Sequence, residues 1–183
     1  MSEFETFSVV LSFILGLGVA QILTSAAHLL HSRRDITLGW TPMLWAYSLL
    51  LYHVNFLFAI LDAGNAEQLW HFNLLLAMLL FLGGVLVLPS PSRPLPEDLN
   101  AFFEADGRLA LVPLGVYVLL TILYYLVSGW SLWTLDGVLL LVLPVIIVVG
   151  WLGRGRIGMF ASAVFSGLVT LAFLFLWPHP GSN

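Results

Sequence analysis

Six long apolar runs dominate this chain and restrict what it can fold into. The runs cover residues 7–30, 41–62, 68–88, 109–128, 133–152 and 157–177, and polar, glycine or proline residues separate them. A helix needs roughly 20 apolar residues to cross a bilayer. Only 9% of the residues are charged, whereas a soluble domain carries about 25%. The sequence therefore predicts an all-α integral membrane bundle of six transmembrane helices, in a single domain covering residues 1–183.

The basic residues predict the orientation of these helices. All six are arginines, and they fall in the first, third and fifth loops: Arg33, Arg34, Arg93, Arg108, Arg154 and Arg156. Arginine-rich loops stay on the cytoplasmic side of a membrane. We therefore expect a multi-pass protein of a bacterial inner (plasma) membrane with both termini outside.

The third loop contains the stretch PLPEDLNAFFEADG, which has the pattern of a short helix over about residues 96–106. Pro96 suits a first helical position, and Leu99, Phe102 and Phe103 would form one apolar face. Such a helix can lie at the inner surface of the membrane. The alternative is a plain connector that packs on the bundle.

Composition argues against most enzymatic chemistry. The chain has no cysteine and no lysine, which excludes disulfides, thiolate metal sites and lysine-based covalent chemistry. It has no HExxH, GxSxG or phosphate-binding glycine motif, and no basic patch of a size that would bind nucleic acid. We expect a non-enzymatic protein with no catalytic residue, no metal and no cofactor, whose partners are membrane lipid and other membrane proteins.

Small residues recur at every fourth position in the first and last apolar runs, as is typical of closely packed membrane helices. The first run has Ser8, Ser12, Gly16, Ala20 and Thr24, and the last has Gly158, Ser162, Ser166 and Thr170. We predict that these two helices pack against each other. The alternative is contact with a second copy of the chain or with another membrane protein.

Polar residues inside the membrane are costly, so each is a candidate site residue. They gather in the first three runs, where the candidates for lining a path or a ligand pocket are Glu5, Gln21, His53, Asn55, Asp62 and Asn73, with His28 and His71 as secondary candidates. This distribution predicts a polar seam between the first three helices. The amides can equally serve as hydrogen bonds that hold the bundle together, and His28 is close enough to the inner surface to extend toward it.

A repeated heptapeptide, LYHVNFL from Leu51 and LWHFNLL from Leu69, suggests a paired site. Residues two apart on a helix point about 200° from each other, so neither copy can present both its histidine and its asparagine to one ligand. The two histidines also differ in depth by roughly 9 Å, which disfavours a haem held between them. Asn55 and Asn73 lie at similar depth, and we predict that these two amides pair across the second and third helices.

The stretches FETFSVVLSFILGLGVAQILTSAAHLLHSRR, HVNF and PEDLNAFFEADGR resemble a group of small bacterial polytopic membrane proteins. The resemblance covers about the first 110 residues and implies a multi-pass helical membrane protein. That group has no established activity, so the resemblance assigns no role to any residue. The small six-helix S-components of vitamin importers are similar only at the level of fold.

Three functions therefore compete at the level of sequence. The first is a membrane protein that passes or binds a small solute or ion along the polar seam. The second is an accessory or scaffold subunit that acts through helix–helix contacts. The third is a haem-binding membrane redox protein.

Overall fold

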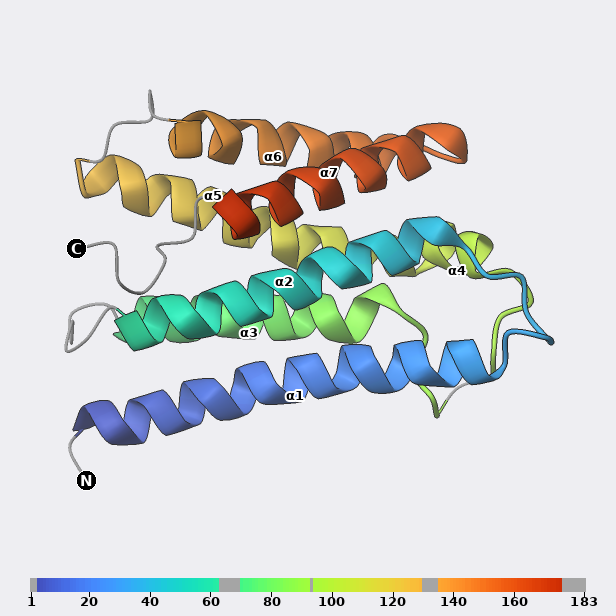
Figure 1. Cartoon of the computed structure of the whole chain (residues 1–183), viewed down its shortest axis with the longest axis horizontal. Helices are drawn as coiled ribbons and strands as arrows, with labels where there is room; N and C mark the ends of the chain where they lie inside the picture. The colour runs from blue at the N-terminus through green and yellow to red at the C-terminus, as the bar shows by residue number, and fades with distance from the viewer. Residues whose placement is uncertain (1–2, 63–69, 93, 130–134, 176–183) are drawn as a thin grey trace.

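The computed structural model of the chain describes residues 3–62, 70–92, 94–129 and 135–175, and these residues form a helical bundle (Figure 1). The long helices are α1 (Glu3–His31), α2 (Trp40–Asp62), α3 (Trp70–Val87), α5 (Leu111–Val127), α6 (Leu135–Leu152) and α7 (Arg156–Phe175). A short helix, α4 (Leu99–Ala105), and a 3-10 turn, η2 (Gly107–Ala110), precede α5. The described part of each of the six apolar runs is thus helical except at run ends such as Leu88 and Ser128, and no strand occurs in these ranges.

Within the described residues, three helices are long and apolar enough to cross a membrane, over Thr6–His31, Gly107–Val127 and Arg156–Leu174. Two shorter apolar helices lie at His71–Val87 and Gly137–Leu152. The remaining long helix, α2, carries Ser48, Tyr52, His53 and Asn55 in its middle part. It lies against α1, α3, α4 and α7 (Figure 1), and its Ser48, Tyr52 and His53 side chains are buried.

Helix α1 lies at the edge of the bundle and packs against α3 and α2. Its buried positions are spaced alternately by four and three residues, at Leu11, Leu15, Gly18, Ile22, Ser25 and Leu29. Ser12, Gly16, Ala20 and Thr24 are exposed, and a side chain added at Gly16 would have no neighbouring atom within 4 Å. The predicted packing of the first helix on the last is therefore wrong, because the small residues of α1 point away from the bundle.

The small residues of α7 do form a packing surface. Gly158, Ser162 and Ser166 are buried and Thr170 is half-buried, but their neighbours are α2 and α6. Aromatic rings fill the space between α2, α5 and α7. Trp45 and Phe165 lie with ring centres 4.7 Å apart, and Tyr52 meets Tyr117 edge to face at 5.4 Å.

Helix α4 packs on the bundle. It begins at Leu99, three residues later than Pro96, because the Asp98 carboxylate caps it by accepting hydrogen bonds from the backbone N–H groups of Asn100 and Ala101. Leu99 and Phe103 are buried in the core. Thr37 joins this segment to the first loop, with its N–H donating to Glu97 (2.8 Å) and its carbonyl accepting from Leu99 (3.1 Å).

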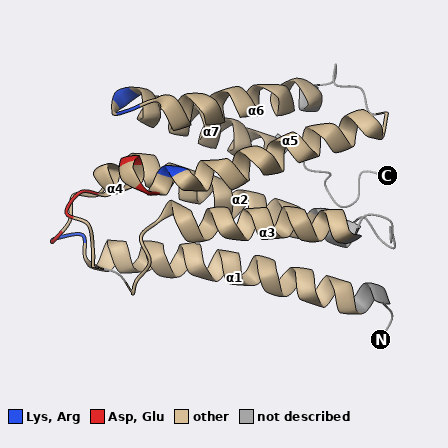
Figure 2. Cartoon of the chain, turned by 180° about the vertical axis from the view of Figure 1, so that it is seen from behind, with Lys and Arg blue, Asp and Glu red and all other residues tan. Residues whose placement is uncertain are grey.

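All the described arginine, aspartate and glutamate side chains lie at the end of the bundle that carries α4 (Figure 2). The first loop, the α4 segment and the turn between α6 and α7 meet there. The loops that sequence predicts on one side of the membrane are thus neighbours in space.

Candidate functional site

His53 is the most deeply buried ionisable side chain of the predicted polar seam. It lies on α2 and is 1% exposed. Its Nδ1 is 2.7 Å from the carbonyl oxygen of Leu49, one turn earlier. Since a carbonyl oxygen only accepts, Nδ1 carries the proton of this hydrogen bond. The other ring nitrogen, Nε2, is buried and has no hydrogen-bond partner among the described residues.

Gly18 of α1 makes room for this ring. A Cβ atom at Gly18 would overlap His53 Nε2 and would lie 2.8 Å from Cδ2. Gly84 of α3 packs on the same part of α1, since a Cβ there would lie 3.2 Å from Ile22 and 3.5 Å from the Gly18 carbonyl oxygen. We call Gly18, His53 and Gly84 the glycine–histidine junction. Here α1, α2 and α3 approach one another closely around a buried imidazole.

Two further polar residues of α1 lie beyond Gly18 along the same helix. Ser25 is buried and Gln21 is half-buried. The Gln21 amide donates a long hydrogen bond of 3.4 Å to the Ser25 hydroxyl. This bond stays within α1, so it does not cross-link the bundle.

Asn55 lies on a different side of α2 from His53. It follows Ser48 by seven residues, or nearly two helical turns, so both point in nearly the same direction. Ser48 meets Ser166 of α7, with their hydroxyl oxygens 3.0 Å apart. Asn55 therefore lies on the α7 side of α2, and the predicted seam divides between two faces of this helix.

The predicted asparagine pair does not form. Both Asn55 and Asn73 are half-buried, and no hydrogen bond joins them within the described residues. Asn73 is eleven residues before Gly84, about three turns, which places it on the side of α3 that faces α1. The two amides lie at similar depth, but Asn55 is on the α7 side of α2 and Asn73 is on the α1 side of α3. Similar depth alone predicts the pair, and it does not fix the side of the helix on which each amide lies.

The remaining candidates lie toward the ends of helices. His71 is exposed at the start of α3, and His28 is half-buried in the last turn of α1. The side chains of Glu5 and Asp62 lie outside the described residues. Because His53 is enclosed and His71 is exposed, the two do not form a paired site. Within the described ranges, no group of three or more histidine, aspartate and glutamate side chains could hold a metal ion.

Hydroxyl groups connect α2 to α7 along a second polar line, of which the sequence analysis identified only the row on the last run. Ser166 lies within hydrogen-bond distance of the carbonyl oxygens of Ser162 (2.7 Å) and Leu44 (3.0 Å). One turn further along, Tyr47 and Thr170 are 3.1 Å apart through their hydroxyl oxygens. Repeated serine and threonine on the last run gave the only sequence signal for this contact, and it did not identify the partner helix.

Comparison with protein-family models, with curated proteins and with solved structures finds no significant match.

Proposed function

We propose that the protein crosses the bacterial inner membrane six times, with both termini on the outer side. Three long apolar helices and two shorter ones support this arrangement, and α2 can join them because its Ser48, Tyr52 and His53 side chains are buried. The gathering of the described arginines at the α4 end supports a cytoplasmic location for that end. Reporter fusions after Asp62 and after Val87 test the topology. We expect an outer location for the first and an inner location for the second, and the reverse pair of results would contradict the proposal.

Within this bundle, we propose a non-enzymatic function, the binding or passage of a proton or another small hydrogen-bond-donating solute at His53. The unpaired, buried Nε2 of His53 carries this proposal. A buried polar atom without a partner costs about 1–3 kcal/mol, and such a cost inside a membrane points to function. The lone pair on Nε2 can accept a hydrogen bond or a proton from a solute that enters the junction.

Access to Nε2 requires a movement of α1, because Gly18 covers the ring. Helix α1 is suited to such a movement. It lies at the edge of the bundle (Figure 1), and its contacts are mainly with α3 and α2. A shift of α1 away from α2 would uncover the imidazole without breaking the α2–α7 or α5–α6 contacts.

Flux into liposomes that contain the purified protein tests the proposal. Proton, Na⁺ and K⁺ uptake would be measured under an imposed gradient, for the native chain, His53→Phe and the control His71→Gln. Phenylalanine keeps a ring but has no nitrogen, so uptake should fall by about tenfold or more, which corresponds to about 1.4 kcal/mol. His71 is exposed, so its variant should keep native uptake. Absence of flux for all three ions, or equal flux in His53→Phe, would contradict a role for His53 in passage.

A scaffold function is the second candidate, and the outward small residues of α1 favour it. Ser12, Gly16 and Ala20 form a row without bulky side chains on an exposed helix face, where a second helix could approach closely. Because the chain has no native cysteine, Gly16→Cys gives a clean cross-linking test in native membranes. A disulfide-linked product that contains the Gly16→Cys chain supports the scaffold function. If the Gly16→Cys chain stays monomeric under conditions that cross-link a positive control, the result argues against this function.

A further inference from the structure

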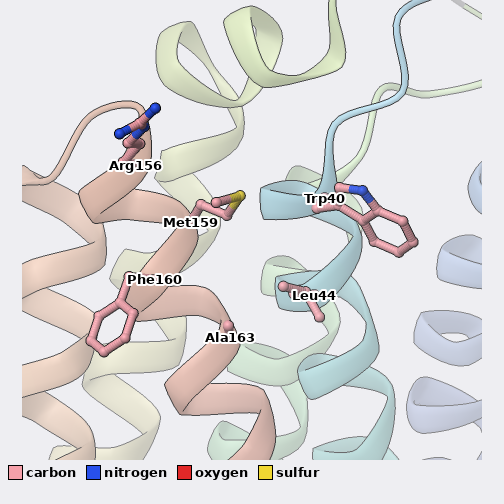
Figure 3. Close-up of a pocket in the computed structure, with 6 residues that line it drawn as sticks. All are labelled: Trp40, Leu44, Arg156, Met159, Phe160 and Ala163. Atoms are coloured by element: carbon pink, nitrogen blue, oxygen red, sulfur yellow. The ribbon is translucent and has the colours of Figure 1, made fainter.

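A groove opens on the side of the bundle, between the start of α2 and the start of α7. Figure 3 shows Met159 and Ala163 on one wall and Trp40 and Leu44 on the other. The cavity measures about 520 Å³, within the usual range for a small-molecule site of roughly 300–1,000 Å³. Trp40 is 73% exposed, so the groove is open to the surrounding membrane.

The walls of this groove are apolar, and one end is basic. From Arg156 to Ala163 the groove follows α7 for seven residues, about 10 Å. Arg156 lies where α7 begins (Figure 3). The positive end of the α7 dipole therefore adds to the charge of this side chain.

A second cavity of about 250 Å³ adjoins the first, and Arg156 and Met159 line both. Arg108 and Glu104 also line the second cavity, so its charged side chains are two arginines and one carboxylate. The carboxylate is already engaged. Its Oε1 accepts a hydrogen bond from the Gly155 N–H at 2.8 Å, and its Oε2 lies 3.6 Å from Arg108 Nη2.

Arg108 retains unused donors in this second cavity. One of its terminal nitrogens, Nη1, donates to the Trp151 carbonyl oxygen at 3.2 Å. Its Nε and Nη2 are buried and have no hydrogen-bond partner among the described residues. A guanidinium group presents its N–H donors in a planar fork that matches a phosphate. An acceptor of negative charge would satisfy these donors.

From this arrangement we propose that the two cavities together form a binding site for an anionic glycerophospholipid. One acyl chain lies in the apolar groove between α2 and α7, and the phosphate group lies between Arg156 and Arg108. The site is at the end of the bundle that carries the described arginines (Figure 2). Basic pockets between helices at that side of a membrane are suited to anionic lipid head groups. A partner helix would match the apolar wall but would leave Arg156 without an anion and the buried Nε and Nη2 of Arg108 without a hydrogen-bond acceptor.

The turn before α7 positions Arg156 for this contact. Gly155 has a positive φ of 54°, a conformation that glycine adopts without strain. Its N–H is held by Glu104, so α4 fixes the point at which α7 begins. The site therefore depends on contacts between three segments that are far apart in the sequence.

Native mass spectrometry of the protein released from nanodiscs tests the proposal. The nanodiscs contain equal amounts of phosphatidylglycerol, which is anionic, and phosphatidylcholine, which is zwitterionic. We expect bound phosphatidylglycerol to exceed phosphatidylcholine about fivefold for each arginine engaged, since one basic residue near an anionic surface is worth about 1 kcal/mol. Equal retention of the two lipids would overturn the proposal.

Two variants with matched controls separate the parts of the site. Arg156→Gln should lower the preference about fivefold, whereas Arg34→Gln removes a charge from another loop and should keep the native preference. Ala163→Trp fills the groove and should reduce bound lipid of both kinds, whereas Leu171→Trp, also at an exposed position of α7, should not. If Arg156→Gln fails to fold, the lipid bound by Ala163→Trp alone tests whether the site exists. Native retention in that variant would overturn the site.

Other occupants give different outcomes in the same experiment. Loss of bound phosphatidylglycerol on adding excess inorganic phosphate would show that the basic cavity takes a free anion, and would overturn the assignment to a lipid. A dimer of the 20.2 kDa chain that Ala163→Trp dissociates would show that a second copy fills the groove, with the same consequence.

Discussion

Substitution of Gly18 by alanine should destabilise the bundle, even though alanine is the better helix former. The added methyl group would occupy space that His53 Nε2 fills and would lie 2.8 Å from Cδ2. Overpacking of this kind costs about 1–3 kcal/mol. If the ring moves away, its hydrogen bond to Leu49 is also lost, at about 0.6 kcal/mol for an average bond within a membrane protein. Together these effects amount to about 2–4 kcal/mol.

Gly16→Ala is the matched control. It makes the same chemical change two residues earlier on α1, where no atom lies within 4 Å of the added methyl group. Alanine is favoured over glycine in a helix by about 1 kcal/mol, so this variant should be as stable as the native chain or slightly more stable. Reversible unfolding in mixed detergent micelles, followed by tryptophan fluorescence, would measure both free energies. Equal stability of the two variants would refute the close contact at the junction.

A double-mutant cycle would then identify His53 as the cause. In the presence of His53→Ala, the cavity left by the ring should accept the methyl group of Gly18→Ala. Gly18→Ala should then lower the free energy of unfolding by at least 1 kcal/mol less in the His53→Ala background than it does in the native chain. An unchanged cost would mean that the methyl group meets something other than the imidazole, and the description of the junction would have to be abandoned.

Two further predictions concern the other side of α2. Ser166→Ala should lower the free energy of unfolding by about 0.6–1.7 kcal/mol, the range for hydrogen bonds between membrane helices. The same unfolding assay would measure this loss, and native stability of the variant would contradict the prediction. Gly150→Ala should cost about 1–3 kcal/mol, because the added Cβ would lie 2.6 Å from Trp45 Cζ2. A shifted tryptophan emission spectrum would accompany this loss, and an unchanged spectrum with native stability would contradict the contact.

The positions of the helices were predictable from sequence because they follow from the length of the apolar runs. The partners of each helix were not, and α1 illustrates why. A row of residues spaced by four turns about 40° around a helix at each step, so Ser8 and Thr24 cannot share one narrow contact face. Spacing that alternates between three and four stays nearly in line, and it places Gly18 at the interface in place of Gly16.

The same limitation applies to the candidate site. Sequence identified His53 as the residue of interest because a histidine in the middle of a membrane run is costly. Its partner, Gly18, carries no polar atom in its side chain and gave no chemical signal. Asn55 was grouped with His53 because both lie on α2, but a helix has several faces, and only tertiary packing shows that Asn55 lies toward α7. Arg108 and Glu104 were counted only as loop charges, since their contacts depend on the distant turn at Gly155.

The contacts between α2 and α7 have a consequence for how the chain is made. Ser48 and Ser166 are separated by 118 residues, so in the proposed topology α2 would enter the membrane long before α7 has left the ribosome. Until then the hydroxyl of Ser48 and the indole of Trp45 face lipid or the insertion machinery. A nascent chain that stops before α7 would expose this face and become a substrate for membrane quality control. In the proposed topology, α2 would therefore reach its final packing only after α7 has been synthesised.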